Sequence, residues 1–143
     1  MHLTNDAVQK NAAEYGKFET ANKLSYDSFQ RYLDMFHAGI KFTETILPKI
    51  QQIVVDSVRA VYSRLDPKDH IHNFELFGYD FMIDDVYKPW LIEVNTNPCL
   101  DTSSIHLVRI ISALIDNTLQ IALDPLFPVK RDGPASTNIN QYE

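Results

Sequence analysis

Two carboxylates and one amide stand out in the stretch 74–98, which reads FELFGYDFMIDDVYKPWLIEVNTNP. Its residues alternate between apolar and polar types, as in two β-strands joined by a turn. Asp80 lies in the first predicted strand, and Glu93 and Asn95 lie in the second. Carboxylate and amide oxygens are the ligands that a hard cation such as Mg²⁺ takes in proteins. The residue types therefore point to a possible metal site on a hairpin.

The expected register brings these oxygen-bearing side chains to one face of the hairpin. A turn centred just after Val86 pairs Asp80 with Glu93 and Gly78 with Asn95. Gly78 would leave space for a ligand to approach the backbone. The other face would then hold strong apolar cross-strand pairs, namely Phe81 with Ile92, Tyr79 with Val94, and Ile83 with Trp90.

Two interpretations of the acidic face stay open on geometry alone. Like charges directly opposite each other on paired strands are destabilising, and a divalent cation held with substrate phosphates would remove the repulsion. Alternatively, the acids belong to a half-solvated sheet face and are simply hydrated. Met82 and Leu91 would share this face, so we expect it to be only partly solvated, which weakens the second interpretation.

Three helices are predicted around the hairpin. The first begins after Ser25 as N-cap and ends at Gly39. The second begins near Thr43 and ends just before Pro67, with Pro48 in its first turn, where a missing N–H is harmless. The third runs from about Ser104 to Leu123, after the cap-rich sequence DTSS. Residues 1–24 are predicted to form a short strand followed by a loop.

Composition indicates a globular, intracellular chain. It is 45% apolar, enough for a core. Its net charge of −6 argues against nucleic-acid binding and against adhesion to an acidic membrane surface. No apolar run approaches 18 residues, so no membrane span is expected. The single cysteine, Cys99, fits a reducing compartment, and we interpret it as a small buried residue and not as a nucleophile.

The motifs of the chain resemble those of the tubulin–tyrosine ligase and tubulin–tyrosine ligase-like family. The resemblance rests on the opening MHLTNDAVQKN, on YGKFETANKLSYDSFQRYL, and on the pair LFGYDFMID…WLIEVN, in this order and spacing. It covers residues 1–128, and the polar stretch 129–143 is expected to be a disordered tail. The resemblance implies an α+β fold: the C-terminal part of an ATP-grasp domain, with an antiparallel sheet whose apolar face packs on the two long helices.

The resemblance also implies a mechanism and a set of site residues. Such ligases use ATP to convert a carboxylate to an acyl phosphate, which an amine then attacks. The family's Mg²⁺ ligands fall on Asp80, Glu93 and Asn95. His2 would position the substrate carboxylate or the incoming amine, or else cap or pack near a strand end. Asn5 belongs to the same HLTN segment and would lie beside the bound nucleotide.

Two lysines in the segment GKFETANK complete the candidate binding residues. Lys17 and Lys23 would lie on a loop near the site, where either would meet a phosphate or an acidic peptide. The alternative interpretation is that both are solvated loop lysines. The histidines His37, His70, His72 and His106 have no metal-binding spacing and are expected to be structural or exposed.

The resemblance further implies partners and a location. The substrates would be a free amino acid (tyrosine, glutamate or glycine) and the C-terminal tails of tubulin, in the cytoplasm, on microtubules and in cilia. The ending EVNTNPCLD is nearer to the glutamylating and glycylating branches than to the tyrosine ligase. The upstream strands of an ATP-grasp fold have no counterpart, so we expect this chain to be inactive alone. A non-catalytic binding module on microtubules and a ligase for another protein are the alternatives.

Overall fold

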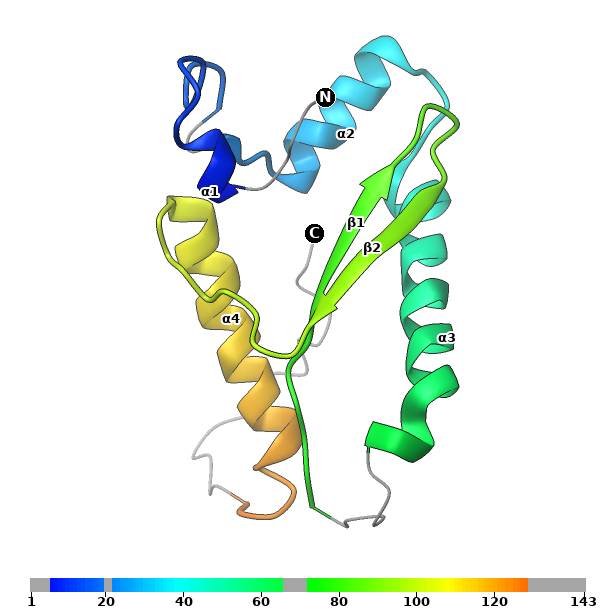
Figure 1. Ribbon diagram of the computed structural model, residues 1–143, viewed down its shortest axis with the longest axis vertical. Coiled ribbons are helices and arrows are strands. Elements are labelled where there is room, and N and C mark those ends of the chain that lie inside the picture. The colour runs from blue at the N-terminus through cyan, green and yellow to red at the C-terminus, as the bar shows by residue number, and fades with distance from the viewer. Residues whose placement is uncertain (1–5, 20–21, 66–71, 129–143) are drawn as a thin grey trace.

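The computed structural model describes residues 6–19, 22–65 and 72–128 of the chain. Its described part is an α+β arrangement with one antiparallel two-stranded sheet. The hairpin lies between two long helices, with α3 along one side and α4 standing apart on the other (Figure 1). The α+β class expected from the sequence is therefore found, and the stretch 129–143 lies outside the described residues.

The N-terminal region departs from the expected strand and loop. Its first described element is a single helical turn, α1 (Asp6–Gln9), and turns follow it up to residue 19. Residues 6–9 are therefore helical, where the sequence predicted only a strand and a loop. Residues 1–5 lie outside the described part of the chain.

Helix α2 (Tyr26–Phe36) begins and ends as its sequence predicts. Ser25 is its N-cap, and the serine oxygen accepts a hydrogen bond from the backbone N–H of Ser28 at 3.1 Å. The helix closes at His37, and Gly39 follows with a φ of 98°, a conformation that glycine adopts without steric cost. Of the apolar stripe, only Leu33 is fully buried.

The long helix begins with a π-helical turn, η2 (Phe42–Ile46), and continues as α3 (Leu47–Leu65). Pro48 is the second residue of α3, as expected for the first turn. Because proline has no N–H, the carbonyl of Glu44 lacks the donor that an α-helix would supply. The N–H of Leu47 instead reaches back five residues to the carbonyl of Phe42, which is the wider π pattern.

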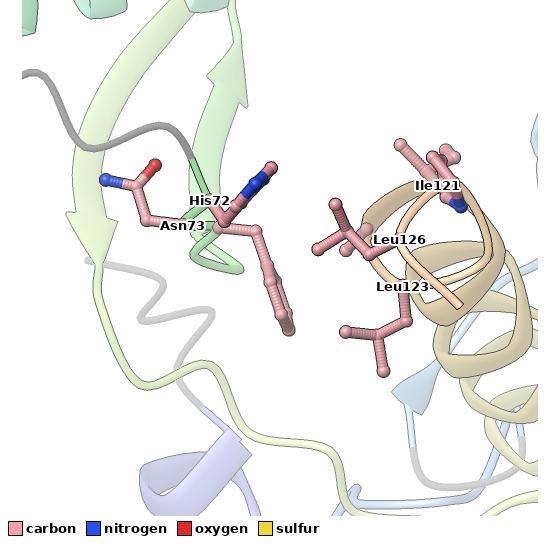
Figure 2. Close-up of a pocket in the computed structure, with 8 residues that line it drawn as sticks. His72, Asn73, Ile121, Leu123 and Leu126 are labelled. Carbon is pink, nitrogen blue, oxygen red and sulfur yellow. The ribbon is translucent and has the colours of Figure 1, made fainter.

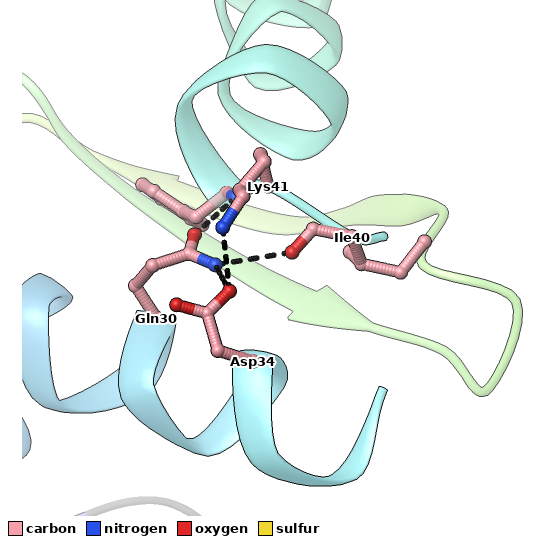
Figure 3. A network of polar contacts seen from close by, with 5 residues as sticks. Gln30, Asp34, Ile40 and Lys41 are labelled. Carbon is pink, nitrogen blue, oxygen red and sulfur yellow. Dashed lines mark hydrogen bonds and ion pairs between the residues drawn. The ribbon is translucent and has the colours of Figure 1, made fainter. Parts of the chain in front are cut away.

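A small core forms where α2, η2 and the hairpin meet. Leu33, Phe42 and Ile46 are its buried residues, and Ile83 and Tyr87 of the hairpin pack against them. Figure 3 shows the polar contacts of Gln30, a residue of α2 that lies beside this core. Its side-chain oxygen accepts from the N–H of Phe42 at 2.7 Å, and its nitrogen donates to the carbonyl of Ile40 at 3.1 Å.

The same network includes an exposed ion pair. Gln30 also donates to Asp34, and Asp34 pairs with Lys41 at 2.7 Å. The hydrogen bond from Lys41, followed by that from Gln30, lowers the pKa of Asp34 below its ordinary value. The pair is solvent-exposed, so its contribution to stability is small compared with the backbone contacts of Gln30.

The hairpin consists of β1 (Gly78–Ile83) and β2 (Pro89–Asn95). The expected pairing is found at the open end, where Asp80 lies opposite Glu93. It is wrong at the turn end, where a β-bulge shifts the register by one residue and leaves Ile92 without a partner. The observed pairs on the turn side of the bulge are Phe81 with Leu91, Met82 with Trp90, and Ile83 with Pro89.

The bulge exchanges two residues between the faces of the sheet. Because side chains alternate along a strand, a one-residue shift turns each of them to the opposite side. Trp90 was expected on the apolar face with Ile83, but it faces Met82 on the side of Asp80. Leu91 was expected beside the acids and instead faces Phe81.

The hairpin loop has three residues, 85–87, because the N–H of Asp84 donates to the carbonyl of Lys88 at 3.1 Å. Within it, the N–H of Tyr87 donates to the carbonyl of Asp84 at 3.1 Å, and Tyr87 takes a φ of 60°. Glycine is usual at this position of a three-residue hairpin loop, since a side chain costs about 1–2 kcal/mol there. The Tyr87 ring packs edge-on against His37 at 5.6 Å, and this burial offsets the strain.

Helix α4 (Ile105–Ala122) starts at the predicted N-cap, since the Ser104 oxygen accepts from the N–H of Leu107 at 3.2 Å.

The sheet contacts α3, through a 2.9 Å hydrogen bond between Ser57 and Tyr79. The sequence predicted that the sheet face of Tyr79 would pack on both long helices. This prediction is wrong for α4, which stands away from the hairpin (Figure 1).

Much apolar surface is left uncovered. Many large apolar side chains of the described residues are exposed, among them Phe18, Ile105 and Phe127. Among the described helices, α4 alone would be able to cross a membrane by length and composition, with a mean hydropathy of 1.2 over 18 residues. Arg109 and Asp116 interrupt it, so its apolar run is not continuous.

Candidate metal centre

The three oxygen-bearing residues expected on one face of the hairpin are found together. Asp80 lies directly opposite Glu93, and Gly78 lies opposite Asn95, so one face of the open end presents all three side chains. The Asn95 amide donates to the Glu93 carboxylate at 3.2 Å. All three residues are exposed, so a ligand has access to them from solvent.

The carboxylates of Asp80 and Glu93 repel each other. The pKa of Asp80 is raised, first by partial desolvation, and then by a hydrogen bond and charge repulsion from Glu93. The repulsion means that the face favours a positive charge, either a proton or a cation, between the two acids. A divalent cation would satisfy both carboxylates at once.

The donor set fits magnesium better than a transition metal. Within the described residues, no group of three or more His, Cys, Asp or Glu side chains is close enough to hold a metal. Two carboxylates and an amide leave coordination positions for water and phosphate, which is the pattern typical of Mg²⁺. The Asn95 amide would have to turn, since its nitrogen now faces Glu93.

The space beside Gly78 is not open to a ligand. A Cβ atom at this position would lie 3.0 Å from the Cβ of Pro98 and 3.8 Å from that of Asn95. The expectation that Gly78 leaves room for ligand approach is therefore wrong. Gly78 allows the segment after β2 to fold back against β1.

The bulge places further residues on the acidic face that sequence reasoning did not find. Trp90 is half exposed, donates from its indole nitrogen to Asp84 at 2.8 Å, and has the Lys88 ammonium 3.9 Å from its ring centre. In a regular strand, Trp90 and Glu93 would lie on opposite faces. Alternation alone therefore does not predict that Trp90 shares the face of Glu93.

The remaining predicted site residues are not brought to the hairpin by the described structure. His2 and Asn5 lie outside the described residues. Lys17 forms an exposed ion pair with Glu14 at 2.7 Å. Its segment lies beyond α1, at the upper left of Figure 1 and away from the hairpin. Lys23 is half-buried and has its own interactions in the same region.

The other candidates have structural positions. Cys99 is exposed, which corrects the expectation of a buried residue, because the segment after β2 runs over the surface. His37 closes α2 and contacts two tyrosine rings, and His106 is exposed on the first turn of α4. His70 lies outside the described residues.

A separate hollow lies at the C-terminal end of α4. It has a volume of about 390 Å³, and Figure 2 shows Leu123 and Leu126 on one side of it, across from His72. The mostly apolar lining also includes Asn73, Phe74, Ile121, Ala122 and Pro125, and His72 is the one titratable side chain in it. The hollow shares no residue with the acidic face of the hairpin.

Comparison with known proteins identifies the family. The family model of the tubulin-tyrosine ligase family matches residues 1–131. The chain belongs to the tubulin–tyrosine ligase family.

The names of individual relatives describe enzymes that modify tubulin. The chain is 33% identical to tubulin glycylase 3B of Tetrahymena thermophila, over 87% of this chain and 10% of the relative. It is 36% identical to the probable tubulin polyglutamylase TTLL9 of Mus musculus, over 85% of this chain and 25% of the relative. The probable alpha-tubulin polyglutamylase Ttll1 of Tetrahymena thermophila is 34% identical, over 86% of this chain and 29% of the relative. The chain thus spans less than a third of the length of these relatives.

Proposed function

We propose that this chain is the metal-binding part of an ATP-dependent ligase that joins an amino acid to tubulin. The observation that carries the proposal is the pairing of Asp80 with Glu93, with Asn95 bonded to Glu93, in a chain of this family. Asp80, Glu93 and Asn95 would hold Mg²⁺, which supplies neutralisation of charge at the terminal phosphates of ATP.

The chain's own residues have a defined task in this reaction. The acceptor carboxylate takes the γ-phosphoryl group from ATP, ADP leaves, and the amine of the second substrate then displaces phosphate to form the amide bond. Asp80 and Glu93 would oppose the charge of the phosphates only through the cation between them, because two bare carboxylates repel phosphate. Their exposure on a sheet face leaves room for the nucleotide.

The added amino acid is proposed to be glutamate or glycine. The names of the relatives, a glycylase and two polyglutamylases, support this choice over tyrosine. The ending EVNTNPCLD resembles the same branches. A place on cytoplasmic microtubules, including those of cilia, follows from tubulin as the substrate. His2 and Asn5 are proposed to contribute from the N-terminal side, and Lys17 and Lys23 to contact phosphate or the acidic tail.

A ligation assay tests the proposal directly. The longest natural protein that carries this sequence is incubated with tubulin, Mg-ATP and labelled glutamate, glycine or tyrosine in separate reactions. Label from glutamate or glycine should enter tubulin, and Glu93→Gln should abolish it. Asp85→Asn is the matched control, because Asp85 is an exposed carboxylate of the same hairpin.

Two results would contradict the proposal. Folded protein that transfers none of the three amino acids would favour a non-catalytic module or another protein substrate. Activity that Glu93→Gln leaves intact would remove the hairpin from the reaction.

A further inference from the structure

The acidic face of the hairpin includes an aromatic side chain that its sequence position does not predict. Trp90 and Glu93 are three positions apart in the sequence, yet the bulge at Ile92 puts both on the face of Asp80. Trp90 pairs with Met82, which is the neighbouring rung on that face. Same-face neighbours along a strand are about 7 Å apart. An ion between the two acids would therefore lie one rung away from Trp90, whose indole is held on the turn side by Asp84.

Asp84 holds the turn end of the hairpin in this shifted register. One carboxylate oxygen accepts from the N–H of Val86 at 3.1 Å and from the N–H of Lys88 at 2.8 Å. The other oxygen accepts from the Trp90 indole at 2.8 Å. The Asp84 N–H in turn donates to the Lys88 carbonyl at 3.1 Å. These contacts tie one side chain to both the turn and the tryptophan.

A comparison with the unshifted register shows which arrangement of Trp90 the contacts of Asp84 favour. Without the bulge, the pairing of Asp80 with Glu93 would continue unshifted to the turn, and Trp90 would lie opposite Ile83. Trp90 would then project to the α3 side of the sheet, and Leu91 would take its place beside the acids. The contacts of Asp84 exist only in the shifted register, since they close a three-residue loop.

We propose that Trp90 forms the turn-side wall of the acidic site and that Asp84 is the positioning residue that keeps it there. This inference rests on the proposed function, because it assigns the wall of the proposed Mg²⁺ site. The Lys88 ammonium, 3.9 Å from the indole ring centre, adds a positive charge on the same wall. The ligand of this wall would be a metal-bound phosphate, with Asp80 and Glu93 holding the cation and Lys88 offering a positive charge to the anion.

The single tryptophan of the chain makes the inference testable by NMR. The ¹⁵N-labelled 143-residue chain has one indole N–H signal, which belongs to Trp90. Cross-strand NOEs report its partner, hydrogen exchange reports its bond to Asp84, and line broadening by Mn²⁺ reports its distance from the ion. The variants are Asp84→Ala, Asp84→Asn and the matched control Asp85→Ala.

The expected results separate the roles of the two carboxylate oxygens. In the unmodified chain, Trp90 shows NOEs to Met82, and Mn²⁺ broadens its indole signal. Asp84→Ala should replace these NOEs with contacts to Ile83, reduce the broadening, and speed indole exchange on the order of tenfold. Asp84→Asn should keep the Met82 NOEs, because one amide oxygen still accepts from the turn, but should lose the indole protection. Asp85→Ala should match the unmodified chain.

The inference is overturned if Asp84→Ala keeps the Met82 NOEs, the broadening and slow indole exchange. If this variant does not fold, Asp84→Asn decides, and unchanged indole protection in it overturns the inference. Failure of the proposed metal site looks different, since Mn²⁺ would then broaden neither Trp90 nor Glu93 in the unmodified chain. In that case the NOEs still decide whether Asp84 positions Trp90.

Discussion

Trp90 and Glu93 lie on the same face of the hairpin although they are three positions apart on β2. A regular strand would place them on opposite faces. The bulge at Ile92 supplies the one-residue offset, and it lies beside the opposed pair of Asp80 and Glu93. The local backbone irregularity thus determines which side chains surround the two acids.

Replacement of Asp80 should improve the fold while it weakens metal binding. Asp80→Asn removes the repulsion from Glu93, so we expect the free energy of unfolding to rise by roughly 0.5 kcal/mol at low salt. The loss of one ligand carboxylate should lower Mn²⁺ affinity by about tenfold or more. Chemical denaturation and Mn²⁺ titration measure the two effects. Asp85→Asn should change neither, and a less stable Asp80→Asn with unchanged Mn²⁺ affinity would refute the assignment.

The pH dependence of Trp90 fluorescence should report the carboxylate of Asp84. The hydrogen bond from the Trp90 indole, followed by that from the Lys88 backbone, lowers the pKa of Asp84. The stabilisation that ionised Asp84 gives to the folded hairpin is therefore complete above the ordinary aspartate pKa. It is lost as the pH falls through the lowered pKa of Asp84. Emission should change only below the usual aspartate range. Asp84→Asn should lack this acid step, and an identical step in that variant would assign it to another group.

Loss of the Gln30 side chain should loosen the core. In Gln30→Ala the N–H of the buried Phe42 loses its acceptor and the Ile40 carbonyl loses a donor. We expect a loss of about 1–3 kcal/mol in the free energy of unfolding. Gln51→Ala is the control, because Gln51 is an exposed residue on α3. Equal stability of the two variants in urea denaturation would show that the network of Figure 3 contributes nothing.

A side chain at Gly78 should clash with Pro98. Gly78→Ala brings a Cβ to 3.0 Å from the Pro98 Cβ, so we expect a loss of about 1–3 kcal/mol. Combining it with Pro98→Gly should recover part of that loss, because the crowding atom is gone. A double-mutant cycle in thermal unfolding measures the coupling. Additive losses would mean that the two residues do not crowd each other.

The 143-residue chain alone should bind Mg-ATP weakly. Its acidic face is open to solvent, because Asp80, Glu93 and Asn95 are all exposed. Phosphates bound on an open face stay hydrated, so each contact with the metal or with Lys88 contributes little. Isothermal titration calorimetry should show no saturable binding below millimolar Mg-ATP. Tight binding by this chain would contradict the expectation.

Local sequence signals predicted the elements well wherever a short-range rule applied. Ser25 and Ser104 marked the helix starts, because a side-chain acceptor satisfies free N–H groups there regardless of distant contacts. The turn residues and the alternation predicted the hairpin and its pairing of Asp80 with Glu93. The sequence also favoured Pro48 in a first turn, since the missing N–H is a property of the residue itself.

The sequence by itself therefore determined the helices, the hairpin, the family and the three candidate ligands. Only the tertiary structure decided the bulge, the side on which Trp90 lies, the exposure of Cys99 and the filling of the space at Gly78 by Pro98. The reason is that capping and alternation depend on neighbours along the chain. The register at the turn depends on contacts of Asp84 across the loop and of Tyr87 with His37 on α2, which no local pattern encodes.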